Sequence, residues 1–482
     1  MFEGEVIALR EQAFVNGEWI TASDDSVQSV LNPATGAYLG SVPQLSVRQV
    51  DGCIRAAETA FYQWREVPVR ERCRLLTAWY ELIMAERERL ARILTLEQGK
   101  PFAEALGEIT YAASYIQWFS QPTLLDTGAT LPYGETPLSM LVLSEPVGVC
   151  AAITPWNFPA AMITRKVAPA LAAGCTMIVK PAPDTPFTAL ALAELAQQAG
   201  IPVGVLNVIT GDAQVIGQRL TSSPTVRKLS FTGSTAVGST LMANCAPTLK
   251  RLSLELGGNA PFIVCDDADI DAAVEGAIAA KFRNAGQTCV CANAIYVDDS
   301  IYDVFAARLV ARVQQLKLGR GDEADVVIGP LINRAAVHKV ERLLADAVSK
   351  GARVLCGGQR WREDANWFVP TVIANANFEM ACVKEEIFGP VAPLVRFTDE
   401  TYLLQQLRQQ HAGLAAYVYS QDLKQIQRFA RDLEVGMVGF NTGLISDAAV
   451  PFGGVKASGM GREGGRQGIE EYLETKYIKL SN

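Results

Sequence analysis

The sequence predicts the α/β fold class, with helices packed on both faces of largely parallel sheets. Beyond residue 147, short apolar runs alternate with helical segments, and this alternation is typical of a Rossmann-type parallel sheet. The chain has 482 residues, too many for one ordinary core, which indicates two or three domains. Two extended segments fall outside the alternation and add a small β element to the prediction.

The expected elements follow one another regularly along the first half of the chain. Residues from about 46 to 107 read as helices, because apolar side chains recur three and four residues apart. Strands are expected at 149–153, 176–180, 205–209 and 228–231, and helices at 160–173 and 186–199. Ligands gather at the carboxyl ends of parallel strands, so Lys180 and Gly233, at two of these ends, are expected at a binding site.

A second α/β region extends from about 259 to 456, with a strand expected at 294–297 and a helix at 301–316. The segments 131–143 and 472–480 each read as an extended ribbon, and such a pair can form a sheet whose edge joins another subunit. The predicted domains are therefore a Rossmann-type domain (1–125 and 145–257), a second α/β domain (258–457) and a small β element (126–144 and 458–482).

Composition excludes several classes of function. The net charge of −8 argues against a nucleic-acid partner, and neither a membrane span nor a secretory signal is visible. Ten cysteines scattered through apolar runs indicate free thiols and a cytoplasmic setting. The two histidines and the lack of a Cys-x-x-Cys pair make a metal site and a Ser-His-Asp triad unexpected.

Two residues stand out as candidates for chemistry. Cys289 lies in KFRNAGQTCVC (281–291), and Glu255 lies in LELGG (254–258). A thiol can add to a carbonyl carbon, and a carboxylate can activate the water that later releases the product. Glycines beside both groups allow a substrate to approach the backbone closely.

These runs resemble the signature of the aldehyde dehydrogenase superfamily. The resemblance extends from about 14 to 477 and includes TPWNFP (154–159), FTGST (231–235), EEIFGP (385–390) and PFGG (451–454). It implies an aldehyde dehydrogenase-like fold in which Cys289 is the nucleophile, Glu255 the general base, and the Asn157 amide and the Cys289 backbone N–H the oxyanion hole. Read without the resemblance, Asn157 is a turn former and Glu255 a strand-end carboxylate paired with an Arg or Lys.

The resemblance also implies a nicotinamide cofactor. The segment from Gly233 to Gly238 lacks G-x-G-x-x-G spacing and is a weak signal alone, although a following helix would favour pyrophosphate at its N-terminus. Many NAD-specific relatives have Glu where Pro183 stands, so we expect NADP to be preferred and NAD accepted, while Asp184 restores some NAD preference. The cofactor-binding residues carried over are Trp156, Lys180, Pro183, Gly233, Ser234, Gly238, Glu386 and Phe388. Read alone, the pair Glu385–Glu386 is a solvated helix start.

Within the superfamily, the sequence is most similar to succinate-semialdehyde dehydrogenases. AAMITRK (160–166), KFRN (281–284), CVC (289–291) and GLIS (443–446) carry this likeness. It implies that Arg165, Arg283 and Ser446 bind the far carboxylate of the substrate, two guanidiniums being suited to gripping such a group. The alternative for both arginines is pairing with internal acids.

Other readings remain open at this point. Glutarate semialdehyde is one methylene longer than succinate semialdehyde, a difference that a pocket discriminates weakly. A structural or binding member of the family without turnover is a second alternative, and an acyl-CoA-forming member is disfavoured because Glu255 implies hydrolysis. The likeness also implies a homo-oligomer, with a tetramer favoured over a dimer.

Cys291 has two interpretations. It is either a small packing residue or the partner of Cys289 in a reversible disulfide that protects an oxidised nucleophile, as in some enzymes of this kind. In an extended strand the two side chains would share a face near the upper limit for a disulfide, and a loop would bring them closer.

Overall fold

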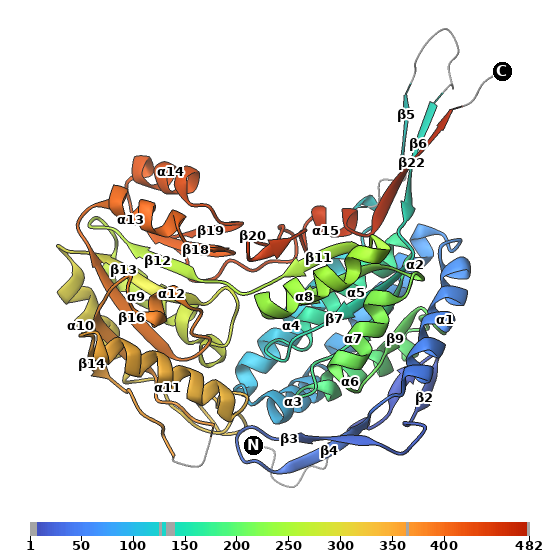
Figure 1. Ribbon diagram of the computed structural model, residues 1–482, viewed down its shortest axis with the longest axis horizontal. Coiled ribbons are helices and arrows are strands. Elements are labelled where there is room, and N and C mark those ends of the chain that lie inside the picture. Colours follow the sequence, from blue (N-terminus) through green and yellow to red (C-terminus); the bar gives the residue numbers. More distant parts are fainter. Residues whose placement is uncertain (1–6, 125–127, 132–139, 363–365, 480–482) are drawn as a thin grey trace.

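The computed structural model describes residues 7–124, 128–131, 140–362 and 366–479. Two α/β lobes lie side by side, and a narrow three-stranded sheet projects from one of them (Figure 1). The predicted α/β class is confirmed.

The first lobe is built on an eight-stranded sheet. Its strands are β1 (Ala13–Val15), β2 (Glu18–Ile20), β7 (Val149–Ile153), β8 (Thr176–Lys180), β9 (Leu206–Val208), β10 (Val226–Thr232), β11 (Arg251–Glu255) and β21 (Gly459–Met460), in the order β2-β1-β9-β8-β7-β10-β11-β21. The five central strands, β9 to β11 in that order, run parallel, as the sequence predicts. The strands at both edges of the sheet are antiparallel additions.

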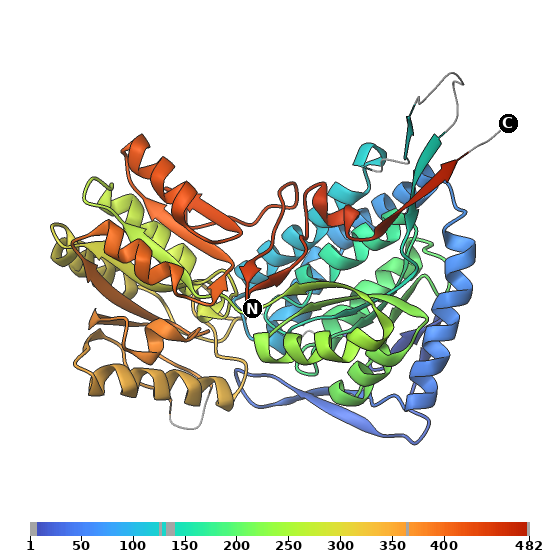
Figure 2. The ribbon, with the colours of Figure 1, turned by 45° about the horizontal axis from the view of Figure 1, so that its top comes forward.

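Helices cover both faces of this sheet (Figure 2). Side chains of β7 alternate between the faces: Cys150 and Ala152 join the larger core with α2 to α6, whereas Val149 and Ala151 join the core with α1, α7 and α8. This alternation is what buries a parallel sheet on both sides. The helices are α1 (Val47–Trp64), α2 (Val69–Ala85), α3 (Arg87–Gln98), α4 (Phe102–Phe119), α5 (Ala161–Ala173), α6 (Pro186–Gln198), α7 (Ala213–Ser222) and α8 (Thr235–Cys245).

The second lobe has a seven-stranded sheet of its own. The strands are β12 (Ala260–Val264), β13 (Ala292–Asp298), β14 (Arg353–Cys356), β15 (Thr371–Ala376), β16 (Val391–Phe397), β18 (Ala415–Tyr419) and β19 (Met437–Phe440), in the order β14-β15-β16-β13-β12-β18-β19. Only β14, at one edge, runs antiparallel to its neighbour. The helices are α9 (Ile270–Phe282), α10 (Tyr302–Val313), α11 (Arg334–Ser349), α12 (Ala381–Lys384), α13 (Glu400–Arg408) and α14 (Leu423–Asp432).

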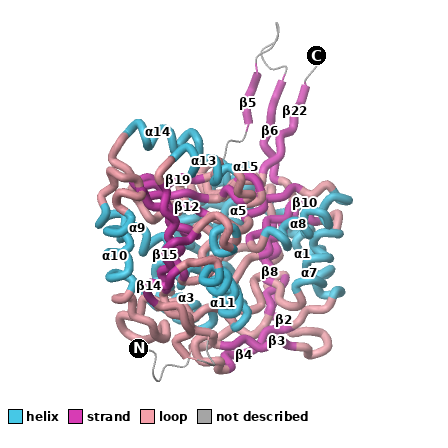
Figure 3. The backbone as a smooth tube through the Cα atoms, turned by 60° about the vertical axis from the view of Figure 1, so that its left-hand side comes forward, coloured by secondary structure: helices cyan, strands magenta, loops and turns pink. Residues whose placement is uncertain are grey.

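The projecting sheet joins segments that are far apart in the sequence. It consists of β5 (Gly128–Leu131), β6 (Met140–Pro146) and β22 (Leu473–Lys479), in the order β22-β6-β5, and it stands clear of both lobes (Figure 3). The predicted ribbons are thus strands where they are described, whereas 132–139 lies outside the described residues. The predicted boundary at 458 stays a prediction, and β21, just beyond it, is hydrogen-bonded to the sheet of the first lobe.

The remaining elements are short. They are the hairpin of β3 (Val27–Leu31) and β4 (Tyr38–Pro43), the pair of β17 (Ala412–Gly413) and β20 (Val455–Lys456), α15 (Gln467–Glu470), and the 3-10 turns η1 (Pro122–Leu124), η2 (Ala246–Thr248) and η3 (Arg283–Gly286). Within the described part of the chain, no helix is long and apolar enough to cross a membrane. No cluster of three potential metal ligands occurs among the same residues.

Candidate active site

Four neighbouring strands bring their carboxyl ends to one edge of the first sheet. Lys180 ends β8, Asn157 follows β7, Gly233 follows β10 and Glu255 ends β11, and these strands are adjacent in that order. Because the four strands are parallel, the residues after them gather at the same edge. Lys180 and Gly233 thus lie at this edge of the sheet, and their roles in binding stay predictions.

The opposite wall comes from the second lobe. A cavity of about 370 Å³ lies between the lobes, and Asn157, Glu255 and Cys289 all line it. The other lining residues include Trp156, Gly233, Ser234, Lys339, Glu386 and Phe388. The three residues expected to carry the chemistry, from separate parts of the sequence, therefore meet at one cavity.

Cys289 is presented by a loop of unusual backbone conformation. After α9 the chain passes through Asn284 and Ala285, whose φ angles are 51° and 54°, before the turn that holds Cys289. A side chain at Gly258 would clash with the carbonyl oxygen of Cys289, so this neighbour must be glycine. Burial raises the pKa of the Cys289 thiol to about 11, an effect that the positive charge of Arg165 opposes. Because the thiolate is the nucleophile, the thiol must lose its proton before the sulfur attacks a carbonyl.

Asn157 is buried, and its amide has a defined direction. The Nδ2 atom donates to the backbone carbonyl of Gln287 at 3.1 Å, whereas Oδ1 has no hydrogen-bond partner among the described residues. An amide nitrogen carries two hydrogens. One N–H of Asn157 is therefore used to join the loop that precedes Cys289, and the second remains for an oxygen in the cavity.

Glu255 is 2 % exposed, and neither carboxylate oxygen has a hydrogen-bond partner among the described residues. Burial raises the pKa of Glu255 well above its usual range, and the charge of Glu463 raises it further, while Arg165 and Lys166 oppose the shift. The alternative of a salt-bridged strand-end carboxylate does not fit, since no ion pair of Glu255 occurs in the described structure. A carboxyl group kept basic by burial suits proton abstraction.

Beside Glu255 lies a buried charge cluster that the sequence reasoning did not find. Arg165 and Lys166, neighbours on α5, both form ion pairs with Glu463, and all three side chains are at most 5 % exposed. Burial of charges is tolerated only when they are paired. Two cations in an otherwise apolar helix indicate that an acid must face them, but nothing local identifies Glu463 as that acid.

The cofactor-binding residues carried over by resemblance fall into two groups. The first group lines the cavity: Trp156 packs edge-to-face on Phe388, with ring centroids 5.6 Å apart, and Glu386 Oε1 accepts the Gly258 N–H at 3.0 Å. Ser234 lies at the N-terminus of α8, where its hydroxyl accepts the Val237 N–H. Burial raises the pKa of Glu386 to about 7.

These features fit a nicotinamide dinucleotide. An aromatic wall, a carboxylate able to accept ribose hydroxyls and a helix N-terminus able to receive phosphate are together at one cavity. Lys180 is also buried at this sheet edge, and burial lowers its pKa to about 8.

The second group lies elsewhere. Gly238 is buried on α8, where a side chain would clash with Leu256, so its described role is close packing of this helix. Pro183 is exposed on a separate cavity of about 440 Å³ formed with the β3–β4 hairpin and the start of α11, and its carbonyl accepts the Gln28 side chain at 3.3 Å. Cofactor contacts of either residue remain predictions.

None of the three residues expected to bind a substrate carboxylate lines the 370 Å³ cavity. Arg165 pairs with Glu463, as the alternative reading proposed, yet its Nη2 has no hydrogen-bond partner among the described residues. The Arg283 guanidinium lies 5.4 Å from the centroid of the Phe158 ring. Ser446 is half-buried.

Comparison with known proteins decides the family. The model of the aldehyde dehydrogenase family matches residues 19–478. The chain belongs to the aldehyde dehydrogenase family. It is 55% identical over 469 residues to the succinate-semialdehyde dehydrogenase [NADP(+)] GabD of Escherichia coli (strain K12), a match that covers 97% of both chains.

Two further relatives of this aldehyde dehydrogenase are similarly close. The glutarate-semialdehyde dehydrogenase of Pseudomonas putida is 54% identical, with 98% of both chains covered. The crystal structure of succinate-semialdehyde dehydrogenase from Burkholderia pseudomallei is 55% identical, covers 98% of both chains and superimposes with a TM-score of 0.96. The aldehyde dehydrogenase fold expected from the resemblance is therefore confirmed.

Cys291 in this aldehyde dehydrogenase is a free thiol, as are the other nine cysteines. Its Sγ donates to the carbonyl oxygen of Lys281 at 3.3 Å, and its backbone N–H bonds to the Thr288 carbonyl at 2.9 Å. The two cysteines therefore lie in a turn and not in an extended strand, since β13 begins only at Ala292. A disulfide with Cys289 would remove the S–H that donates to the Lys281 carbonyl.

Proposed function

We propose that this aldehyde dehydrogenase oxidises succinate semialdehyde to succinate, with NADP as the preferred cofactor and NAD also accepted. The convergence of Cys289, Asn157 and Glu255 on one cavity carries the proposal for the reaction. The 55% identity to relatives named for succinate semialdehyde, one of them NADP-dependent, supports the choice of substrate and cofactor.

The first half-reaction depends on Cys289 and Asn157. The Cys289 thiol loses its proton to water in the cavity, a loss that the positive charge of Arg165 favours. Its sulfur then adds to the aldehyde carbon, forming a thiohemiacetal whose oxygen receives the unused N–H of Asn157 and the backbone N–H of Cys289. When bound, a nicotinamide cofactor would accept the hydride, and Trp156 and Phe388 would help to hold it. Loss of hydride from the carbon leaves a thioester on Cys289.

The second half-reaction depends on Glu255. Its carboxylate takes a proton from water, and the resulting hydroxide attacks the thioester carbonyl and releases the acid together with the Cys289 thiol. Both oxygens of Glu255 are without hydrogen-bond partners among the described residues, so either can accept this proton. Arg165 and Lys166 keep positive charge beside this carboxyl group, against the negative charge of Glu463.

Arg165, Arg283 and Ser446 are proposed to bind the far carboxylate. Two guanidinium groups near the thiol favour an aldehyde that carries an anionic end. Glutarate semialdehyde is the runner-up substrate, supported by the 54% identity to the glutarate-semialdehyde dehydrogenase, because one methylene alters binding by only about 1–3 kcal/mol. A family member without turnover is disfavoured, since all three chemical groups line the cavity.

Initial rates decide among these alternatives. Reduced cofactor is measured with succinate semialdehyde, glutarate semialdehyde and butanal, each with NADP and with NAD. We expect the highest kcat/KM with succinate semialdehyde and NADP. Turnover of butanal at an equal kcat/KM would refute carboxylate recognition, and absence of turnover with all three aldehydes would refute the dehydrogenase activity.

The protein is further proposed to be a cytoplasmic homotetramer. Ten free thiols support a reducing compartment. The three-stranded sheet supports assembly, because it stands clear of both lobes and has an open edge at β22. Mass measurement in solution distinguishes a tetramer from a dimer.

A further inference from the structure

Lys100 and Glu108 form a buried ion pair that the mechanism above does not use. Lys100 lies between α3 and α4, Glu108 lies on α4, and both side chains are 1 % exposed. The Lys100 Nζ atom donates to Glu108 Oε2 at 2.5 Å. Burying two charges is costly unless their remaining donors and acceptors are also hydrogen-bonded. The other hydrogen bonds of Lys100 and Glu108 therefore identify the segment that the pair fixes in place.

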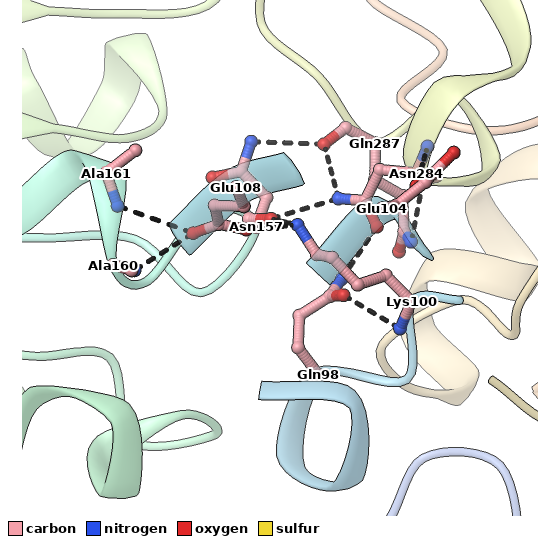
Figure 4. A network of polar contacts seen from close by, with 9 residues as sticks. All are labelled: Gln98, Lys100, Glu104, Glu108, Asn157, Ala160, Ala161, Asn284 and Gln287. Carbon is pink, nitrogen blue, oxygen red and sulfur yellow. Dashed lines mark hydrogen bonds and ion pairs between the residues drawn. The ribbon is translucent and has the colours of Figure 1, made fainter. Parts of the chain in front are cut away.

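The remaining bonds of the pair converge on the segment 157–161 (Figure 4). Lys100 Nζ donates to the backbone carbonyl of Asn157 at 2.8 Å. Glu108 Oε1 accepts the backbone N–H groups of Ala160 and Ala161, at 2.9 and 3.4 Å. These are first amides of α5, and the Ala160 side chain at its N-cap has no acceptor, so Glu108 caps this helix from outside.

The Asn157 carbonyl is also tied to the loop that carries Cys289. Asn284 Nδ2 donates to it at 3.0 Å, and Asn284 is itself fixed by Gln98, whose Nε2 atom donates to Oδ1 at 3.1 Å. The Asn157 side chain reaches the same loop through Gln287. Asn157 is thus held at its carbonyl and at its amide, with Lys100 as the charged donor.

We propose that Lys100 and Glu108 are positioning residues that aim the Asn157 amide at the oxygen of the thiohemiacetal. The inference rests on the proposed role of Asn157 in the reaction. Neither residue lines the catalytic cavity, so both act through the segment 157–161. Small errors matter here, because a misplacement of about 1 Å can cost about 100-fold in rate.

A double-mutant cycle tests the proposal. Lys100→Met removes the donor to the Asn157 carbonyl, and Glu108→Gln keeps an acceptor for α5 while removing the charge. Each is expected to lower kcat by about 10- to 100-fold, while the KM of the cofactor stays within about twofold. Asn157→Ala alone is expected to lower kcat by about 10²–10³-fold. In the Asn157→Ala background, Lys100→Met is expected to cause less than about a twofold further loss, because residues that act through one group are not additive.

Lys228→Met is the matched control. Lys228 on β10 is also 0 % exposed and also pairs with a carboxylate, Glu471, but it has no bond to the segment 157–161. It is expected to lower the Tm without changing kcat. A Lys100→Met loss of equal size with and without Asn157, or an unchanged kcat in Lys100→Met and Glu108→Gln, would overturn the proposal. If Lys100→Met does not fold, Glu108→Gln carries the cycle alone.

The cycle is also run with p-nitrophenyl acetate in the absence of cofactor. Attack of the Cys289 sulfur on this ester forms a tetrahedral oxyanion at the same place, which expels p-nitrophenolate and leaves an acetyl thioester that water hydrolyses. If the wild type hydrolyses the ester but does not oxidise succinate semialdehyde, the proposed function is refuted while the positioning role is not. Additive losses on the ester would refute the positioning role whatever the natural aldehyde is.

Discussion

Replacing Glu255 with Gln is expected to separate the two half-reactions. Glutamine has the size of glutamate but cannot take a proton from water, so formation of the thioester continues while its hydrolysis slows. A general base contributes about 10²–10⁴-fold, and neither carboxylate oxygen of Glu255 is hydrogen-bonded to another described residue. We therefore expect steady-state kcat to fall by this factor, to a residual rate set by unassisted water.

Stopped-flow absorbance of the reduced cofactor measures the effect. The variant is expected to show a burst of about one equivalent per active site, followed by the slow phase, because the thioester accumulates. Glu66→Gln, at a carboxylate that is 71% exposed, is the control and is expected to behave as wild type. A Glu255→Gln enzyme with wild-type steady-state turnover, or with neither burst nor turnover, would refute the assignment of Glu255 to hydrolysis.

The same substitution predicts a change in the pH dependence of stability. Burial raises the pKa of Glu255 above its usual value of 4.5, so the folded protein holds this proton at pH values where the unfolded chain has released it. The free energy of unfolding of wild type therefore falls as the pH rises from about 4.5 towards the raised pKa, by about 1.4 kcal/mol for each unit of difference. Glutamine lacks this proton, so the Tm of Glu255→Gln minus that of wild type is expected to increase as the pH rises from about 4.5 towards the raised pKa. Parallel Tm curves would contradict the buried, proton-holding state.

Three further predictions concern specificity and redox chemistry. Arg283→Ala is expected to raise KM for succinate semialdehyde about ten- to 100-fold, because one charge-assisted hydrogen bond worth about 1.5–3 kcal/mol is lost. KM for butanal is expected to stay unchanged, and an equal increase for both aldehydes would show that Arg283 has a structural role. Pro183→Glu is expected to weaken NADP binding by repulsion of the 2′-phosphate and to leave NAD binding similar or better, and an unchanged ratio of the two Kd values would place cofactor choice elsewhere. After treatment with peroxide, wild type is expected to recover with dithiothreitol whereas Cys291→Ala is not, and equal recovery of the two enzymes would exclude a protective disulfide.

The elements around the site were predictable from local patterns. The strands at 149–153 and 176–180 have the predicted bounds, because each is a short apolar run that ends at a polar or turn-forming residue. Parallel order then follows from the helices between them, and it places Lys180 and Gly233 at the binding edge. The pairing of the ribbons was foreseen for a similar reason, since both lie outside the βα alternation.

Long-range pairings could not be predicted in this way. Glu463 pairs with Arg165 and Lys166, which lie about 300 residues earlier in the chain. In the sequence, nothing distinguishes Glu463 from the other acidic residues. The left-handed φ angles at Asn284 and Ala285 also had no signal, because alanine has no preference for that region. The sequence therefore identified Cys289 but neither the geometry of its loop nor the raised pKa of its thiol.

The antiparallel addition of β21 to β11 has a consequence for the order in which the enzyme is built. Glu255 is paired with Gly459, and its neighbour Glu463 arrives with the same late segment. A ribosome adds about 5–20 residues per second. The roughly 200 residues between Glu255 and Gly459 therefore take on the order of 10–40 s to synthesise. A nascent chain can therefore fold the parallel core of its first lobe while the strand of the general base still has an unpaired edge. The surroundings of Glu255 are completed only after the segment 459–463 has been made, so a chain that stops before it has an incomplete site.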